Sequence, residues 1–151
     1  MKVLVTGGAG YIGSHTIVEL LLEGHEVVCL DNFCNSSPKA IDRIIKICDD
    51  EGLSDQAITV IEGDIRSEET IKNIFKNHSI ESVIHFAGLK AIGESVEKPL
   101  KYYNNNVGGT LNLLQAMRNA EVYQIVFSST ASIYGVPENL PLSEKSPTKQ
   151  P

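Results

Sequence analysis

The first thirteen residues contain the feature that most limits what this chain can fold into. A short β-branched run, Val3 to Val5, is followed by glycines and then by a helical pattern of apolar residues from Tyr11 to Glu23. The glycines read Gly7-x-x-Gly10-x-x-Gly13, overlapped by Gly8-x-Gly10-x-x-Gly13. Glycine suits a tight turn, a close approach of the backbone to a pyrophosphate, and close packing of the helix on the sheet. The pattern predicts a dinucleotide-binding turn with the phosphates at the helix N-terminus.

The second predicted strand, Glu26 to Leu30, ends in an acid. Asp31 follows Gly13 by 18 residues, close to the roughly 20 residues at which such units place an acid on the adenosine ribose. Its carboxylate can accept hydrogen bonds from both ribose hydroxyls and would repel a 2′-phosphate, which favours NAD over NADP. The alternative is a glycine-rich turn in a flavodoxin-like protein, with Asp31 capping a helix.

Strands and helices are predicted to alternate along the rest of the chain. Pro38 suits the first turn of a helix, and Ser67 precedes a helix with acids in its first turn. A long helix is predicted from about Pro99 to Asn119, and further strands at residues 58–61, 82–86 and 122–127. This order predicts an α/β fold, a Rossmann-type doubly wound parallel sheet in one domain over residues 1–151.

The segment from Ser128 to Pro151 differs from the rest of the chain. It has no clear periodicity and holds four of the six prolines. A structureless stretch of that length is uncommon inside a compact domain. We therefore expect a fragment, truncated after about five strands and lacking a C-terminal substrate-binding part.

Charge and composition exclude several classes of protein. The formal net charge is −6 and no Lys/Arg cluster stands out, so we expect no nucleic-acid partner. No apolar stretch is long enough to span a membrane, and the N-terminus does not read as a signal peptide. The cysteines at positions 29, 34 and 48 lack metal-ligand spacing. An odd number of cysteines without an export signal predicts free thiols in the cytoplasm.

A second acid follows the third predicted strand. Asp64 stands at the carboxyl end of that strand, the edge at which open α/β sheets bind their ligands. An acid there could accept a hydrogen bond from the adenine amino group. Asp64 could also cap the helix that begins near Ser67, and the two roles are compatible.

Longer segments carry a family resemblance. Thr6-Gly7-x-x-Gly10-x-x-Gly13 is typical of extended short-chain dehydrogenase/reductases. The chain resembles the nucleotide-sugar epimerases of that family over essentially its whole length. The resemblance is most specific in the segments Asp31-Asn32-Phe33-Cys34-Asn35-Ser36, His85 to Val96 (HFAGLKAIGESV), Tyr102 to Val107 (YYNNNV) and Phe127 to Gly135 (FSSTASIYG).

The resemblance implies an isomerase with tightly held NAD, a UDP-hexose substrate and a homodimer. Hydride would leave C4 of the sugar and return to its other face. Thr130 matches a hydroxyl residue, commonly Ser, that hydrogen-bonds the sugar O4, and Lys90 would contact both cofactor and substrate. The remaining residues matched to the cofactor are Gly7, Gly10, Tyr11, Ile12, Gly13, Asp31, Asn32, Phe33, Cys34, Asn35, Ser36, Asp64, Ile65, Phe86, Ala87, Gly88, Leu89 and Asn105.

One part of the family's machinery is missing from these residues. The acid/base pair of the family is a Tyr-x-x-x-Lys on one helical face, and no tyrosine here has a lysine four residues later. We therefore expect this chain by itself to be inactive. Two alternatives remain open: another NAD-dependent nucleotide-sugar epimerase or dehydratase, and a non-catalytic NAD-sensing Rossmann protein.

Overall fold

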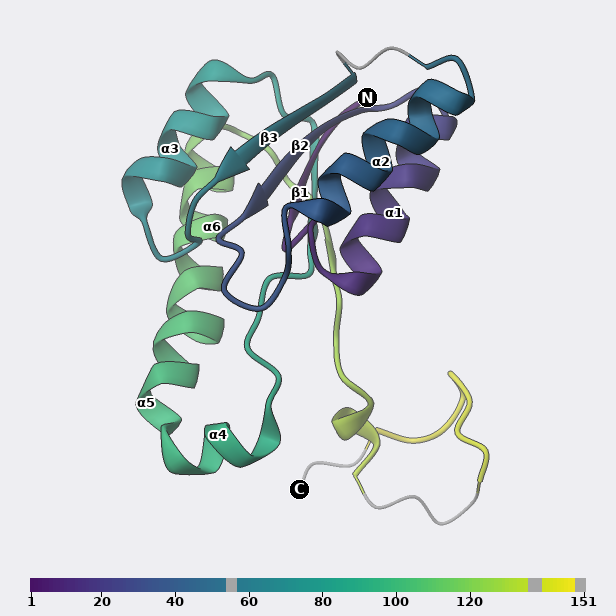
Figure 1. The fold of residues 1–151 in the computed structure, drawn as a ribbon. Coiled ribbons are helices and arrows are strands. Elements are labelled where there is room, and N and C mark those ends of the chain that lie inside the picture. Colours follow the sequence, from purple (N-terminus) through teal and green to yellow (C-terminus); the bar gives the residue numbers. More distant parts are fainter. Residues whose placement is uncertain (54–56, 136–139, 149–151) are drawn as a thin grey trace.

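The computed structural model describes residues 1–53, 57–135 and 140–148. Its centre is a five-stranded, all-parallel sheet with the order β3-β2-β1-β4-β5 (Figure 1). The order reverses direction between β1 and β4, which is the topological switch point of a doubly wound fold. The predicted fold class is confirmed. The strands are β1 Lys2–Thr6, β2 Glu26–Asp31, β3 Ile58–Glu62, β4 Ser82–His85 and β5 Gln124–Phe127.

Helices cover both faces of the sheet. Helices α1 (Tyr11–Leu22) and α2 (Lys39–Asp50) lie on one face, and α3 (Glu68–Asn77) and α6 (Gly109–Asn119) on the other (Figure 1). Side chains of a strand alternate between the faces. In β1, Val3 and Val5 belong to the core under α1 and α2, whereas Leu4 belongs to the core under α3 and α6.

Local signals set the helix ends. Gly24 has φ +76° and donates a 3.0 Å hydrogen bond to the Leu21 carbonyl, which confirms it as the residue that closes α1. The helix ends at Leu22, one residue before the predicted end. The Ser67 hydroxyl oxygen caps α3 by accepting a hydrogen bond from the Thr70 N–H.

The predicted long helix is not uniform. It consists of α5 (Pro99–Tyr102), a π-helical segment η2 (Tyr103–Gly108) and α6. The spacing of apolar residues along the sequence does not distinguish such a widened, π-helical turn from an ordinary α-helical one. A further helix, α4 (Ile92–Glu97), escaped prediction because it buries no residue. Its Glu94 carboxylate instead accepts hydrogen bonds from Lys101 and Tyr102 of α5.

Strands β1, β2 and β3 extend one residue beyond their predicted bounds at one or both ends, whereas β4 and β5 are shorter than predicted. Strand β4 ends at His85, although the next residue, Phe86, still donates a hydrogen bond to the Thr6 carbonyl. Strand β5 begins at Gln124, because Val122 donates to the Met117 carbonyl and so completes the end of α6.

After β5 the chain makes one short 3₁₀ turn, η3 (Ala131–Tyr134). Residues 136–139 and 149–151 of the predicted irregular tail lie outside the described part of the chain. None of the helices in the described ranges combines the length and apolarity needed to cross a membrane.

Candidate functional site

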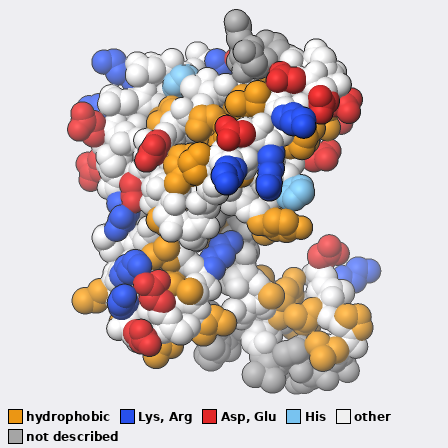
Figure 2. Space-filling model, in the orientation of Figure 1, with side chains coloured by type: hydrophobic (Ala, Val, Ile, Leu, Met, Phe, Trp, Pro, Cys, Tyr) orange, Lys and Arg blue, Asp and Glu red, His pale blue; other side chains and the backbone are white. Residues whose placement is uncertain are grey.

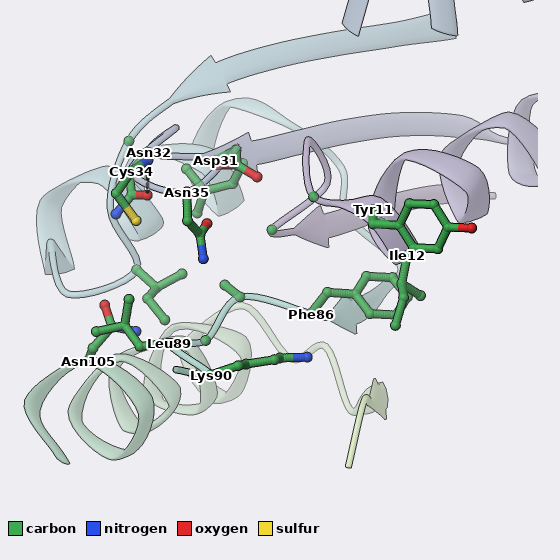
Figure 3. A pocket seen from close by; sticks show the side chains of 18 residues that line it. Tyr11, Ile12, Asp31, Asn32, Cys34, Asn35, Phe86, Leu89, Lys90 and Asn105 are labelled. Carbon is green, nitrogen blue, oxygen red and sulfur yellow. Dashed lines mark hydrogen bonds between the residues drawn. The ribbon is translucent and has the colours of Figure 1, made fainter. Parts of the chain in front are cut away.

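A cavity of about 320 Å³ lies at the carboxyl ends of the parallel strands. Its walls come from the loops after β1, β2, β3 and β4 and from the π-helical segment η2. Tyr11 and Ile12 stand at one end, Asn32, Cys34 and Asn35 at the other, and Lys90 along one side (Figure 3). The lining residues are Gly7, Gly10, Tyr11, Ile12, Gly13, Leu30, Asp31, Asn32, Cys34, Asn35, Gly63, Ile65, Phe86, Ala87, Gly88, Leu89, Lys90 and Asn105.

Two glycines, one in the loop after β1 and one in the first turn of α1, have a steric requirement. Gly7 has φ +70°, and a Cβ there would lie 2.7 Å from the backbone nitrogen of Ala87. A Cβ on Gly13 would collide with the Gly7 carbonyl oxygen. Because both positions exclude a side chain, the loop after β1, the first turn of α1 and the loop after β4 can approach one another closely.

The N-terminus of α1 opens on the cavity. The first backbone N–H groups of a helix lack partners within the helix and carry a partial positive charge. Tyr11 and Ile12, which begin α1, line the cavity, and the first turn contains no acid that would compete for those groups. Over the face seen in Figure 2, acidic and basic side chains are interspersed. An anion in this cavity would therefore be held by local groups, the helix end among them, and not by a broad basic surface.

Asp31 is held by three protein donors. Asp31 is buried, with 7% of its accessible surface exposed. Its Oδ2 accepts a 2.9 Å hydrogen bond from the Ala9 N–H, and its Oδ1 accepts from the Phe33 N–H and the Ser36 hydroxyl. Phe33 and Ser36, predicted to contact a cofactor, do not line the cavity. They position Asp31, which does line it.

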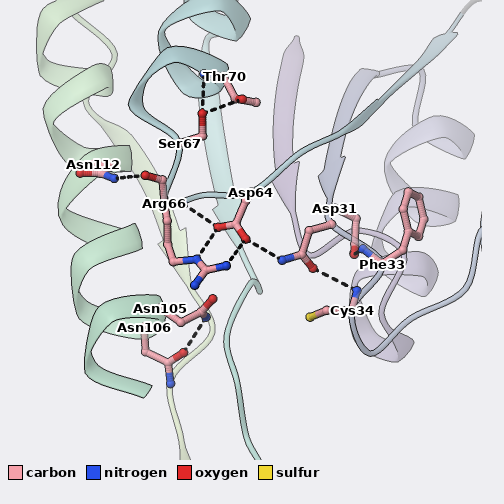
Figure 4. A network of polar contacts seen from close by, with 11 residues as sticks. Asp31, Phe33, Cys34, Asp64, Arg66, Ser67, Thr70, Asn105, Asn106 and Asn112 are labelled. Carbon is pink, nitrogen blue, oxygen red and sulfur yellow. Dashed lines mark hydrogen bonds and ion pairs between the residues drawn. The ribbon is translucent and has the colours of Figure 1, made fainter. Parts of the chain in front are cut away.

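Asp64 lies at the centre of a polar network (Figure 4). Its carboxylate accepts hydrogen bonds from Nε, Nη2 and the backbone N–H of Arg66, and a fourth from Asn32 Nδ2 at 2.9 Å. The hydrogen bonds from Arg66 hold the pKa of Asp64 far below its usual range. The alternative role, in which Asp64 caps α3, is wrong because the Ser67 hydroxyl caps that helix. Asp64 does not line the cavity, although its neighbours Gly63 and Ile65 do.

The wall after β4 is attached to η2 by a side chain. The Asn106 amide accepts a 2.8 Å hydrogen bond from the Leu89 N–H and donates a 2.9 Å hydrogen bond to the Leu89 carbonyl. Asn105 is buried beside it and lines the cavity. Lys90 is exposed, and within the described ranges it takes part in no ion pair. Its ammonium group is thus available to an anionic ligand.

His85 lies beneath this wall and is buried. Burial is the main cause, and the charge of Lys90 a second cause, of a pKa lowered to about 4. The imidazole is therefore neutral near physiological pH, and its burial is that of a structural residue.

Thr130 is a further predicted site residue that does not line the cavity, in addition to Phe33, Ser36 and Asp64. It is exposed and precedes η3, where its hydroxyl oxygen accepts a 3.2 Å hydrogen bond from the Ser132 N–H. The three cysteines are free: Cys29 and Cys48 are buried, as expected for packing residues, and burial raises the pKa of the Cys29 thiol to about 12. Cys34 lines the cavity.

Sequence reasoning missed four residues of the site. Leu30 and Gly63 line the cavity because they lie at or next to the carboxyl ends of predicted strands, and that position could have been used to predict them. Asn106 holds Leu89 from another segment of the chain, a contact that no local pattern marks. Arg66 holds its near neighbour Asp64, and their closeness in the sequence was a usable signal.

Proteins of similar sequence are enzymes that act on nucleotide sugars, in agreement with the resemblance noted above. The family model described as GDP-mannose 4,6 dehydratase matches residues 4–151. A UDP-glucose 4-epimerase of Haemophilus influenzae is 56% identical over 95% of this chain and 41% of its own length. A UDP-glucose 4-epimerase of Klebsiella pneumoniae is 57% identical over 95% of this chain and 99% of its own. The chain thus spans about two-fifths of the first of these relatives and nearly all of the second.

Solved structures agree with the sequence relatives. The UDP-glucose 4-epimerase of Bifidobacterium longum in complex with NAD+ and UDP superimposes with a TM-score of 0.89 at 47% identity, covering 99% of this chain and 43% of that one. The epimerase of Stenotrophomonas maltophila, with bound NAD and formylated UDP-arabinopyranose, gives 0.88 at 43% identity with the same coverage. The chain belongs to the GDP-mannose 4,6 dehydratase family, and within it to the UDP-glucose 4-epimerases.

Proposed function

We propose that this chain supplies the NAD-binding part of an enzyme that interconverts UDP-glucose and UDP-galactose. The observation that carries the proposal is the cavity at the switch point of the sheet, in which the glycine turn and Asp31 are joined by a hydrogen bond. Relatives solved with NAD and UDP compounds have the same fold over 99% of this chain. These likenesses support the proposal.

The lining residues suit the parts of a dinucleotide. The diphosphate would lie on the N-terminus of α1, where Gly7 and Gly10 leave room for it. A carboxylate oxygen has two lone pairs, and Asp31 Oδ2 accepts one hydrogen bond within the protein. Its second lone pair is thus open to an adenosine ribose hydroxyl, and its charge would repel a 2′-phosphate. NAD is therefore favoured over NADP.

At the far end of the cavity, Asn32 and Asn35 would meet the adenine. Asp64 could accept a hydrogen bond from the adenine amino group only in exchange for one of its four present donors, because a carboxylate offers about four lone pairs. The adenine would replace the hydrogen bond from Asn32, because the other three come from Arg66, which binds both carboxylate oxygens of Asp64. Cys34, Ile65 and Asn105 complete the proposed cofactor wall.

The reacting end of the site is less complete. Bound NAD+ would supply a reversible acceptor for hydride from C4 of the hexose. Lys90 would face the anionic groups of cofactor and substrate, and Thr130 would donate a hydrogen bond to the sugar O4. The 151 residues contain no Tyr-x-x-x-Lys. We therefore expect this polypeptide alone to bind NAD+ without epimerising sugar.

A homodimer is proposed from an exposed apolar stripe on the α5–η2–α6 helix. Leu100, Tyr103, Val107, Leu111 and Leu114 follow one another at intervals of three or four residues and are 42–82% exposed. This spacing places them on one side of a helix, as in helix–helix interfaces. A second copy would bury the stripe. The free thiols of the chain support placement in the cytoplasm.

Two measurements test the proposal. Calorimetric titration of the chain is expected to show binding of NAD+ and at least about tenfold weaker binding of NADP+, the difference that about 1.4 kcal/mol produces. The product of the complete gene is expected to convert UDP-galactose to UDP-glucose without added NAD+. Equal affinity for the two dinucleotides, or no conversion by that product, would contradict the corresponding part of the proposal.

A further inference from the structure

A chain of hydrogen bonds runs through His85, the last residue of β4. His85 is 1% exposed, and its two ring nitrogens meet two threonine hydroxyls. Nδ1 lies 2.6 Å from the hydroxyl oxygen of Thr6, the last residue of β1. Nε2 lies 2.9 Å from the hydroxyl oxygen of Thr110 in α6. The imidazole therefore links the strand that precedes the glycine loop to the helix that follows η2.

The partners at the two ends determine the direction of every bond. The Thr110 hydroxyl donates a 2.6 Å hydrogen bond to the Asn106 carbonyl, which can only accept. Since a hydroxyl has one proton, Thr110 must accept from His85, and Nε2 carries the proton. The neutral ring then has a bare Nδ1, to which the Thr6 hydroxyl donates. The Thr6 oxygen in turn accepts a 3.4 Å hydrogen bond from the Ala87 N–H.

The ring is neutral under ordinary conditions. Burial and the nearby charge of Lys90 both disfavour the imidazolium and lower the pKa of His85 to about 4. A second proton on Nδ1 would also face the Thr6 oxygen and leave the Thr6 proton without its acceptor. All four hydrogen bonds therefore point the same way, from the Ala87 N–H to the Asn106 carbonyl, and every donor and acceptor in the chain has a partner. Hydrogen bonds aligned in this way strengthen one another.

The hydrogen-bond chain reaches three walls of the cavity: the glycine loop, the loop after β4 and η2. Thr6 precedes Gly7, whose Cα approaches Ala87 too closely for a side chain. Ala87 belongs to the loop after β4. Asn106 holds Leu89 of that loop by two hydrogen bonds and adjoins Asn105, which lines the cavity.

We propose that His85 is a positioning residue for the dinucleotide cavity, which, as a neutral imidazole protonated on Nε2, holds the glycine loop, the loop after β4 and η2 in the binding geometry. The role rests on the proposed function, because it concerns affinity for NAD+. No atom of His85 needs to touch the cofactor. Its effect passes through Thr6 on one side and through Thr110 and Asn106 on the other.

The first test needs no ligand. In the ¹⁵N-histidine-labelled chain near neutral pH, the His85 ring is expected to show the proton on Nε2 alone. In Thr110→Val, which removes the hydroxyl with little change of shape, Nε2–H loses its acceptor and the proton is expected to move to Nδ1, where Thr6 can accept it. A proton on Nδ1, or on both nitrogens, of the unaltered chain would overturn the hydrogen-bond chain.

The second test separates positioning from general stability. Thr110→Val is expected to weaken NAD+ binding by about tenfold at a temperature where all the variants are folded. With the ring proton on Nδ1, the buried Thr6 hydroxyl loses its acceptor, and the glycine loop that follows Thr6 is no longer held in place. Thr110→Ser, which keeps the hydroxyl, is expected to restore both the proton position and the affinity. Thr16→Val is the matched control, because Thr16 of α1 also donates to the carbonyl four residues earlier but does not contact His85.

The outcomes are distinct. If Thr110→Val moves the ring proton but binds NAD+ as tightly as Thr16→Val, the positioning role is overturned. If the unaltered chain does not bind NAD+, the proposed function fails, and with it the positioning role, whereas the proton position still decides whether the hydrogen-bond chain exists.

Discussion

The backbone N–H of Ala9 donates a 2.9 Å hydrogen bond to Oδ2 of Asp31. The bond joins the middle of the glycine turn to the end of the neighbouring strand, so it fixes the carboxylate relative to the turn. Phe33 and Ser36 hold the other carboxylate oxygen. A carboxylate fixed in this way is oriented before any ligand arrives, which lowers the entropic cost of binding.

Asp31→Asn is expected to weaken NAD+ binding by about 10- to 100-fold, because hydrogen bonds to a charged group contribute roughly 1.5–3 kcal/mol. The amide also places a donor against the donors that surround position 31. NADP+ should lose less affinity, since the repulsive charge is gone. Calorimetric titrations with both dinucleotides measure this, with Asp42→Asn, an exposed acid of α2, as the control. A parallel loss for the two dinucleotides would argue against a role of Asp31 in discrimination.

Gly7→Ala and Gly24→Ala form a matched pair, because both glycines have φ near +70°. At Gly24 a Cβ meets nothing within 4 Å, so alanine should cost only the backbone strain of about 1–2 kcal/mol. At Gly7 the Cβ would also strike Ala87, and both stability and NAD+ binding should fall. Urea unfolding and NAD+ titration of the two variants test this. The steric explanation fails if Gly7→Ala behaves like Gly24→Ala in both assays.

The stability of the chain is expected to decrease as the pH falls from about 6.5 to about 4. The pKa of His85 is about 4 in the folded protein, below the value of 6.5 for a free histidine. In this window the unfolded chain binds a proton that the folded chain does not, so protonation favours unfolding, by roughly 3 kcal/mol in all. Urea unfolding at several pH values gives the slope. His85→Gln should remove this part of the slope, and replacement of the exposed His15 by Gln should leave it in place.

The proposed contact of Asp64 with adenine is tested by nicotinamide hypoxanthine dinucleotide, in which a carbonyl oxygen replaces the amino group. The unaltered chain should bind this analogue about tenfold more weakly than NAD+, because two acceptors would face each other. Asp64→Ala should bind both dinucleotides with equal, reduced affinity. Asn112→Ala removes the bond to the Arg66 carbonyl but leaves the Asp64 carboxylate in place, and should retain the preference. A preference that survives in Asp64→Ala would place the recognition of the amino group elsewhere.

The apolar stripe of the long helix predicts that Leu111→Arg will shift the chain from dimer to monomer, because a charge would be buried without a partner. Sedimentation velocity over a range of concentrations measures the shift. Ile47→Arg makes the same exchange at an exposed position of α2, on the other face of the sheet, and should not change the assembly. A monomeric unaltered chain would refute the proposed dimer.

Local patterns carried much of the information about this chain. The alternation of apolar runs predicted all five strands and their parallel orientation, since consecutive strands separated by helices must cross over the sheet. Gly24 and Ser67 marked helix ends by their own backbone and side-chain chemistry. The positions of Gly7, Gly13 and Asp31 predicted the cavity, because each lies at the end of a strand or the start of a helix, and these ends meet at the carboxyl edge of the sheet.

The sequence by itself thus determined the sheet, the position of the cavity at its carboxyl edge, and most of the residues that line it. Only the tertiary structure decided which polar groups remain available to a ligand. Arg66 and Asn32 occupy the oxygens of Asp64, Phe33 and Ser36 support Asp31, and His85 depends on Thr6 and Thr110. The physical reason is competition, because a side chain has few donors and lone pairs. Some residues that take them are close in the sequence, as Arg66 is to Asp64 and Phe33 to Asp31. Others come from distant segments, as Asn32 does for Asp64 and as Thr6 and Thr110 do for His85, and only the folded backbone brings these side chains together. Asp31 therefore lines the cavity as predicted, whereas the carboxylate of Asp64 is already occupied.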